Sequence, residues 1–182
     1  MKNFKHLLFL SILCSLSCSV LRRATVKSPI YLDQNGVTVI STEDAVIGES
    51  YELDGVSYLV VDSTMLYTMV ANDEDVTKVI TTNVTDMSKM FYDSQFNGDI
   101  SNWDVSNVTD MSMMFYYAPT FNQNIGSWDV SKVTDMFGMF LYAETFNQNI
   151  GYWEVSNVTN MSDMFYSASS FNQDIGSWDV DN

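Results

Sequence analysis

The stretch that decides the fold is Val108–Lys132, with the sequence VTDMSMMFYYAPTFNQNIGSWDVSK. The same pattern recurs at residues 133–157 and 158–182, and a version one residue shorter occupies residues 84–107. Self-similarity at a fixed period of about 20 to 50 residues is typical of stacked repeat architectures. Because a single unit cannot bury its own large apolar side chains, we expect the four units to stack.

Each unit predicts one short helix and one short strand. Asp110 precedes Met111, Met114 and Phe115, a spacing that indicates a capped helical turn with one buried face. The Trp128-Asp-Val segment places two apolar residues two apart, which suits a short strand. The predicted fold class is an α/β solenoid, a stack of four coils of 24–25 residues that together occupy residues 84–182.

Equivalent positions of stacked units form columns along the stack. The methionine and phenylalanine columns are expected to form the core. A column of asparagines is expected to form a ladder whose amides satisfy backbone groups in the next unit. Its members are Asn97, Asn122, Asn147 and Asn172.

Residues 30–83 are predicted to form a small β-rich cap that protects the first unit of the stack. The Asp54-Gly55 pair is a strong hairpin signal, so we expect Tyr51–Leu53 to pair with Val56–Val61. Asp62 or Ser63 is then expected to cap a short helix that ends by Asn72.

Residues 1–19 indicate an export signal, with two lysines followed by an apolar run of about ten residues. That run is too short to span a bilayer, which needs about 20 apolar residues. Cys18 follows a Ser15-Leu16-Ser17 segment that resembles a bacterial lipoprotein signal, so both lipidation of Cys18 and simple cleavage near Ser17 or Ser19 remain open. Residues 20–29 are expected to be a tether.

The composition excludes several function classes. The formal net charge is −15, and clustered lysine and arginine are lacking, so nucleic acid is not an expected partner. The single histidine, His6, and both cysteines, Cys14 and Cys18, lie within the predicted export signal. The remaining chain therefore lacks thiol or imidazole nucleophiles and the usual zinc ligands, and no cofactor is expected.

One column of the repeats carries only carboxylates: Asp104, Asp129, Glu154 and Asp179. Like charges at this spacing destabilise a stack unless they are solvated or bridged by cations. A hydrated edge, calcium bound between units and an acidic strip for a basic partner are the alternatives. Two neighbouring carboxylates can also catalyse the hydrolysis of a glycosidic bond, although the column does not single out one pair.

The consensus VTDMSxMFxxAxxFNQDIGSWDVSN resembles the repeat of the BspA-like surface proteins, bacterial leucine-rich-repeat-like domains also named for mycoplasma lipoproteins. The segment from Asn35 to Met87 is also similar to what precedes the repeats in that family. The resemblance implies an exported or cell-surface repeat protein, often lipid-anchored, with adhesion or partner binding and no catalytic activity.

We therefore expect a non-catalytic exported surface protein that binds a protein or glycan through the exposed face of the stack. A carboxylate-dependent glycan hydrolase and a structural envelope scaffold are the alternatives. Contact with a membrane is expected only through a lipid anchor. Aromatic residues beside the turns are the expected partner contacts because they combine apolar area with a hydroxyl, namely Tyr116, Tyr117, Tyr142, Tyr152 and Tyr166.

Overall fold

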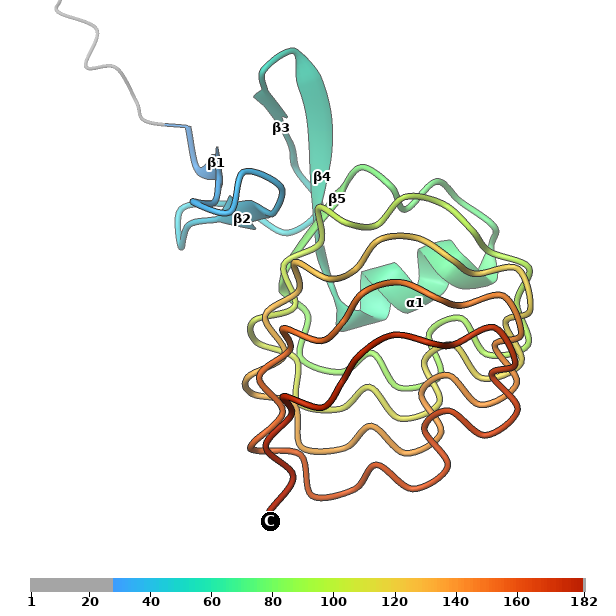
Figure 1. The fold of residues 1–182 in the computed structure, drawn as a ribbon. Helices are drawn as coiled ribbons and strands as arrows, with labels where there is room; N and C mark the ends of the chain where they lie inside the picture. Colours follow the sequence, from blue (N-terminus) through green and yellow to red (C-terminus); the bar gives the residue numbers. More distant parts are fainter. Residues whose placement is uncertain (1–27, 182) are drawn as a thin grey trace, which may run out of the picture.

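The computed structural model describes residues 28–181. A small β-rich segment with one helix precedes a stack of similar layers (Figure 1). The predicted export signal, Cys18 and most of the predicted tether lie outside the described residues. Within residues 28–181, no helix has the length and apolar character that a membrane span needs.

The cap segment, residues 30–83, begins with two short antiparallel strands. β1 (Ile30–Leu32) pairs with β2 (Val39–Ser41), and Ile30 and Val39 are buried. The backbone N–H of Val39 donates to the Asn102 carbonyl at 2.9 Å, which ties this ribbon to the first repeat. Ile30 and Val39 form a small core of their own with Val60 and Ile80.

The predicted hairpin and helix are confirmed. β3 (Ser50–Leu53) pairs antiparallel with β4 (Val56–Asp62), and the Asp54-Gly55 turn has positive φ at both residues. α1 (Ser63–Ala71) follows directly, with Asp62 as its N-cap and Asn72 as its C-cap. β5 (Val79–Asn83) then returns parallel to β4, which gives a three-stranded sheet of order β3-β4-β5.

The predicted α/β solenoid is wrong. Residues 84–181 contain no helix and no strand, only turns and three isolated parallel bridges, and the one helix of the described chain precedes the repeats. The expected helical turn is absent because Asp110 Oδ1 accepts from the N–H two residues later, at Ser112, as in a polar turn. The Trp128-Asp-Val segment is likewise outside any strand.

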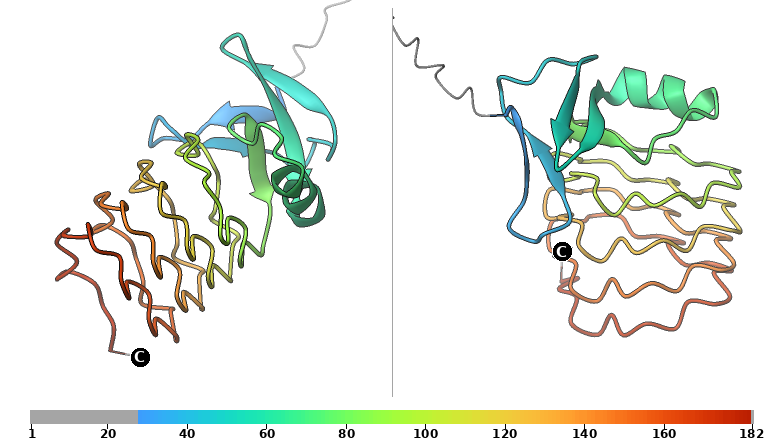
Figure 2. Two further views of the ribbon diagram at one scale, coloured as in Figure 1. Left: turned by 90° about the vertical axis from the view of Figure 1, so that its right-hand side faces the viewer. Right: turned by 90° about the horizontal axis from the view of Figure 1, so that it is seen from above.

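The repeats nevertheless lie against one another in register (Figure 2). In the first repeat, alternate N–H groups from Met87 to Asp93 donate to carbonyls of the second repeat at 2.8–2.9 Å. The second and third repeats donate onward in the same way. Backbone groups that a helix would satisfy internally are thus satisfied by the neighbouring repeat.

The predicted asparagine ladder is confirmed. Oδ1 of Asn97 accepts from the backbone N–H of Asn122, and the same bond joins each asparagine of the column to the next, at 2.9 Å in every case. Glutamine side chains donate to the same oxygens, for example from Gln148 to Asn122. The tryptophans add a second tie, since the indole N–H of Trp128 donates to the Ile100 carbonyl of the preceding repeat.

The core consists of columns of identical side chains, as the repeat pattern predicts. Buried methionines and tryptophans run through the stack, and Phe91, Phe115, Phe140 and Phe165 stack face to face with ring centroids 5.5–5.7 Å apart. Leu66 and Met69 of α1 belong to the same cluster. The cap helix therefore closes the apolar side of the first repeat.

Candidate binding surface: a strip of tyrosines

The residues after each buried Met-Phe pair turn outward. The first of these positions holds Tyr92, Tyr116, Leu141 and Tyr166 in the four repeats, and the second holds Asp93, Tyr117, Tyr142 and Ser167. None of these eight residues is buried. Because the phenylalanine before them is anchored in the core, the backbone presents both positions at the surface.

Five tyrosines from these two columns form one continuous strip, which we call the tyrosine strip. The Tyr92 and Tyr116 rings stack with centroids 4.6 Å apart, and Tyr117 and Tyr142 lie 5.4 Å apart. Tyr142 also meets Tyr116 and Tyr166 edge to face, at 6.2 and 5.7 Å. Tyr142 thereby replaces the ring that Leu141 lacks, so the contacts continue across all four repeats.

The strip has both apolar and polar surface. Tyr117 is 51% exposed and Tyr166 is 58% exposed. A shallow cavity of about 270 Å³ lies between Tyr116, Tyr142, Tyr166 and the Asp163 carboxylate. Loss of hydration, together with the neighbouring Tyr92 and Tyr142 hydroxyls, raises the pKa of the Tyr116 hydroxyl above its ordinary value, so this hydroxyl is a neutral hydrogen-bonding group at physiological pH.

Two tyrosines of the strip occupy left-handed backbone positions. Tyr117 has φ 54° and Tyr142 has φ 58°, and the equivalent Asp93 and Ser167 have φ 52° and 58°. This conformation therefore belongs to the repeat and not to the tyrosine. Bulky residues there cost free energy that glycine or asparagine would avoid.

The structure brings together four of the five expected contact residues and leaves one apart. Tyr116, Tyr117, Tyr142 and Tyr166 share the strip, whereas Tyr152 lies in another turn, between Gly151 and the buried Trp153, and is 88% exposed. The sequence reasoning missed Tyr92. Its signal was available, because Tyr92 follows Met90-Phe91 as Tyr116 follows Met114-Phe115.

The carboxylate column does not form a uniform edge. Asp104 is buried, and its Oδ1 accepts from both the N–H and the hydroxyl of Ser106. Asp129 and Asp179 each accept from the N–H two residues later, while Glu154 is exposed. These three aspartates thus shape local turns.

Metal binding at this column has no preformed site in the part of the chain that is described. Among residues 28–181, no group of three or more His, Cys, Asp or Glu side chains is close enough to hold a metal ion. Asp104 and Asp129 border one cavity of about 210 Å³ together with Asp33 of the cap segment. Glu154 and Asp179 lie outside it.

A family model described as "Mycoplasma protein of unknown function, DUF285" matches residues 61–178. The chain belongs to this family. The DUF285 match begins at the end of β4 and includes α1, the repeats and the whole tyrosine strip. It is narrower than the resemblance expected from the sequence, which began at Asn35. No curated protein and no solved structure matches the chain.

Membership in DUF285 places the repeats in a mycoplasma-type family, which agrees with the coarser part of the expected resemblance. The family description assigns no activity.

Proposed function

We propose that this DUF285 protein is a non-catalytic surface protein of the BspA-like kind that binds an elongated protein or glycan ligand along the tyrosine strip. The observation that carries the proposal is the continuity of the strip: rings from all four repeats touch one another at the surface. A ligand that crosses several repeats would meet apolar ring faces and hydroxyls in succession.

The backbone strain at Tyr117 and Tyr142 supports the same proposal. Both rings are held at positive φ, where the repeat would be more stable with a smaller residue. A second position of the repeat also has positive φ, and it holds Lys89, Met113, Gly138 and Asp163, so the backbone tolerates several side chains there. The rings of Tyr117 and Tyr142 occupy this conformation at the surface, where they are available to a partner.

The proposed location is the outside of the cell. It rests on the export signal expected at residues 1–19 and on the lipoprotein-like segment before Cys18. Expression of the full chain with labelled palmitate should label the protein if Cys18 is lipidated, and Cys18→Ala should abolish the label. Equal labelling of the wild type and of Cys18→Ala would exclude Cys18 as the lipidation site.

The binding proposal is tested with paired variants of the full chain. Tyr117→Gly and Tyr142→Gly remove strip rings at positions that accept glycine. Tyr152→Ser removes an exposed tyrosine outside the strip and installs the residue that the second and fourth repeats have there, Ser127 and Ser177. Binding is measured to an array of glycans and to immobilised extracellular-matrix proteins.

We expect the strip variants to lose at least about tenfold in affinity for the ligand that the wild type retains, because aromatic anchors dominate such contacts. Tyr152→Ser should bind as the wild type does. Loss of binding in Tyr152→Ser alone would place the partner on the other turn and contradict the proposal.

The hydrolase alternative is separated by the same glycans. Binding without release of product agrees with a non-catalytic role. Turnover that disappears in Asp129→Asn would overturn it, because Asp129 faces a cavity that Asp104 also borders. Wild-type protein that neither binds nor cleaves any member of either panel would favour the envelope-scaffold alternative.

A further inference from the structure

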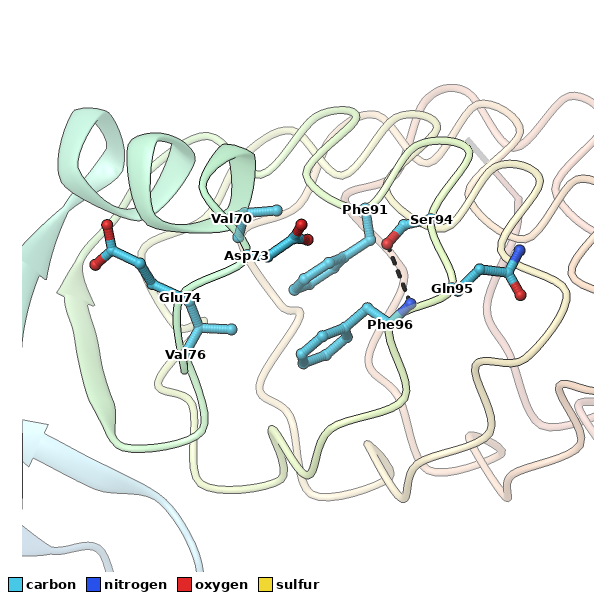
Figure 3. Close-up of a pocket in the computed structure, with 8 residues that line it drawn as sticks. All are labelled: Val70, Asp73, Glu74, Val76, Phe91, Ser94, Gln95 and Phe96. Carbon is cyan, nitrogen blue, oxygen red and sulfur yellow. Dashed lines mark hydrogen bonds between the residues drawn. The ribbon is translucent and has the colours of Figure 1, made fainter.

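A cavity of about 280 Å³ lies where the cap segment meets the first repeat (Figure 3). Val70, Asp73, Glu74 and Val76 line it from the cap, and residues of the first repeat line it from the other side. Those are Phe91, Ser94, Gln95 and Phe96. None of these residues belongs to the tyrosine strip.

The cavity coincides with the one irregularity of the repeat. The second, third and fourth repeats have a buried alanine between their two phenylalanines, for example Ala118, whereas the first repeat is one residue shorter and has the half-buried Ser94. The N–H of Phe96 donates to Ser94 Oγ at 3.1 Å, where Phe121 instead donates to the Ala118 carbonyl. The shortened turn therefore leaves space that the other repeats fill.

Two stacked rings border this space, of which Phe91 is buried and Phe96 is half-buried. Phe91 begins the column of stacked phenylalanines, so its cavity side meets the cap and not another phenylalanine of the column. Phe96 stacks on Phe91 with centroids 4.2 Å apart and also lines the cavity. The face of an aromatic ring is the negative part of its quadrupole and attracts cations.

The cavity is negatively charged, because Asp73 and Glu74 line it and no lysine or arginine does. In Figure 3 the Asp73 carboxylate points toward the Phe91 ring, while the Glu74 carboxylate points away from both rings and accepts from Asn72. Residues 28–181 contain all 23 acidic residues and only three lysines, a formal charge of −20. None of these lysines, Lys78, Lys89 and Lys132, lines the cavity.

We propose that this cavity binds a primary alkylammonium group on a short apolar chain, with the ammonium at Asp73 and the chain against Phe96 and Val70. A free amine and the lysine side chain of a partner protein share this chemistry. The volume of the cavity admits only a small group. The Phe96 ring, the Asp73 carboxylate and the lack of a lysine in the lining each favour the same ligand.

The test is a titration of the isotopically labelled full chain with n-butylammonium chloride, followed by NMR at the Phe96 amide and the Phe91 and Phe96 ring signals. Potassium chloride at the same ionic strength controls for screening, and 1-butanol controls for the apolar chain. A blocked Gly-Lys-Gly peptide forms a second arm: saturation by the peptide indicates a lysine side chain as the source, and saturation by the amine alone indicates a small molecule.

Asp73→Asn is the decisive variant. Asparagine tolerates the φ of 55° at this position, so the backbone should persist while the charge is lost, and we expect about threefold to fivefold weaker binding. Asp54→Asn is the matched control, since Asp54 also has positive φ, at 50°, and lies in the β3–β4 turn outside the cavity. Val70→Phe should fill the cavity and abolish binding without changing the charge.

Three results would overturn the proposal: equal shifts with 1-butanol, binding unchanged in Asp73→Asn, or binding unchanged in a folded Val70→Phe. A fourth result would also overturn it: if Asp54→Asn weakens binding as much as Asp73→Asn does, the loss reflects a general charge effect. None of these variants or signals involves a residue of the tyrosine strip, so failure here leaves the proposed function untouched.

Discussion

Single residues in the repeats divide between those that hold neighbouring repeats together and those that leave surface available. Asn122 belongs to the first group, because its Oδ1 accepts from the Asn147 N–H and from the Gln148 side chain. Tyr117 belongs to the second, because it is half exposed and its backbone conformation opposes its size. Asparagine occupies its position in every repeat, whereas the position of Tyr117 holds tyrosine in only two of the four repeats.

The asparagine ladder predicts a stability loss for Asn122→Ala. That change leaves the Asn147 N–H without an acceptor, which should cost about 1–3 kcal/mol of unfolding free energy in urea. Asn122→Asp keeps the Oδ1 acceptor and is the control, with a loss of less than about 1 kcal/mol. Equal losses in the two variants would mean that the acceptor oxygen is not what the ladder requires.

The left-handed backbone predicts an unusual ranking at position 117. Tyr117→Gly should be more stable than Tyr117→Ala by about 1 kcal/mol, because alanine keeps the Cβ that opposes the φ of 54°. Thermal unfolding of the two variants measures the difference. The same comparison at Tyr152, which is not among the positive-φ residues, should give no advantage to glycine.

Among the elements, α1 connects the cap to the stack. Asp62 Oδ1 accepts from the Met65 N–H at 2.8 Å, which fixes where the helix begins, and buried Leu66 and Met69 cover the first repeat. On the same helix, the Tyr67 hydroxyl donates to the Ser88 carbonyl. Burial raises the pKa of Tyr67, and the negative charges of Asp86 and Asp110 act in the same direction.

This contact predicts a pH-dependent effect of Tyr67→Phe. The folded state favours the protonated hydroxyl, so the stabilisation is complete below the unfolded pKa of about 10 and is lost as the pH rises above it. The variant should be less stable than the wild type by about 0.5–1.5 kcal/mol at pH 7. Denaturation at pH 7 and at pH 10.5 should show this gap shrinking, and a gap that widens would contradict the argument.

Local signals explain which elements the sequence predicted. The Asp54-Gly55 turn and the Asp62 cap act within a few residues, so the hairpin and α1 were predicted with their ends nearly correct. The helical turn predicted in each repeat was wrong because the spacing of Met111, Met114 and Phe115 also suits a series of tight turns. Backbone N–H groups there find carbonyls in the next repeat, a long-range choice that periodicity does not contain.

Only part of the candidate binding surface was predicted, again because long-range contacts decide it. The tyrosines were visible, but their union into one strip depends on the register between repeats. Tyr142 touches Tyr116 across the gap at Leu141, and Tyr152 faces elsewhere, although all are exposed or half-buried tyrosines beside turns. The cavity at Phe96 was unpredicted because it needs the cap and the shortened first repeat together.

The whole molecule behaves as one array because each repeat contacts mainly its neighbours. Stability in such arrays is approximately a sum of repeat and interface contributions. The columns of methionine, phenylalanine and asparagine keep their spacing only if repeats are added or removed as complete units.

Removal of residues 133–157 should therefore give a folded, less stable protein. Lys132 then joins Val158, and the second repeat meets the fourth with every column preserved. Removal of residues 133–145 breaks the columns and should unfold the chain beyond the break. Urea midpoints followed by tryptophan fluorescence distinguish the two, and equal loss of folding in both deletions would contradict an additive array.

The hydrogen bonds between repeats, which run in both directions along the stack, also affect how the protein resists mechanical tension. Because alternate N–H groups from Met87 to Asp93 donate toward the second repeat, a pull along the stack loads these bonds along their length, one interface after another. Repeats should then detach singly under an optical trap. Each rupture would release one whole repeat, an extension of about 80 to 90 Å. A stack of this design would yield to tension in steps, absorbing force while the remaining repeats stay folded.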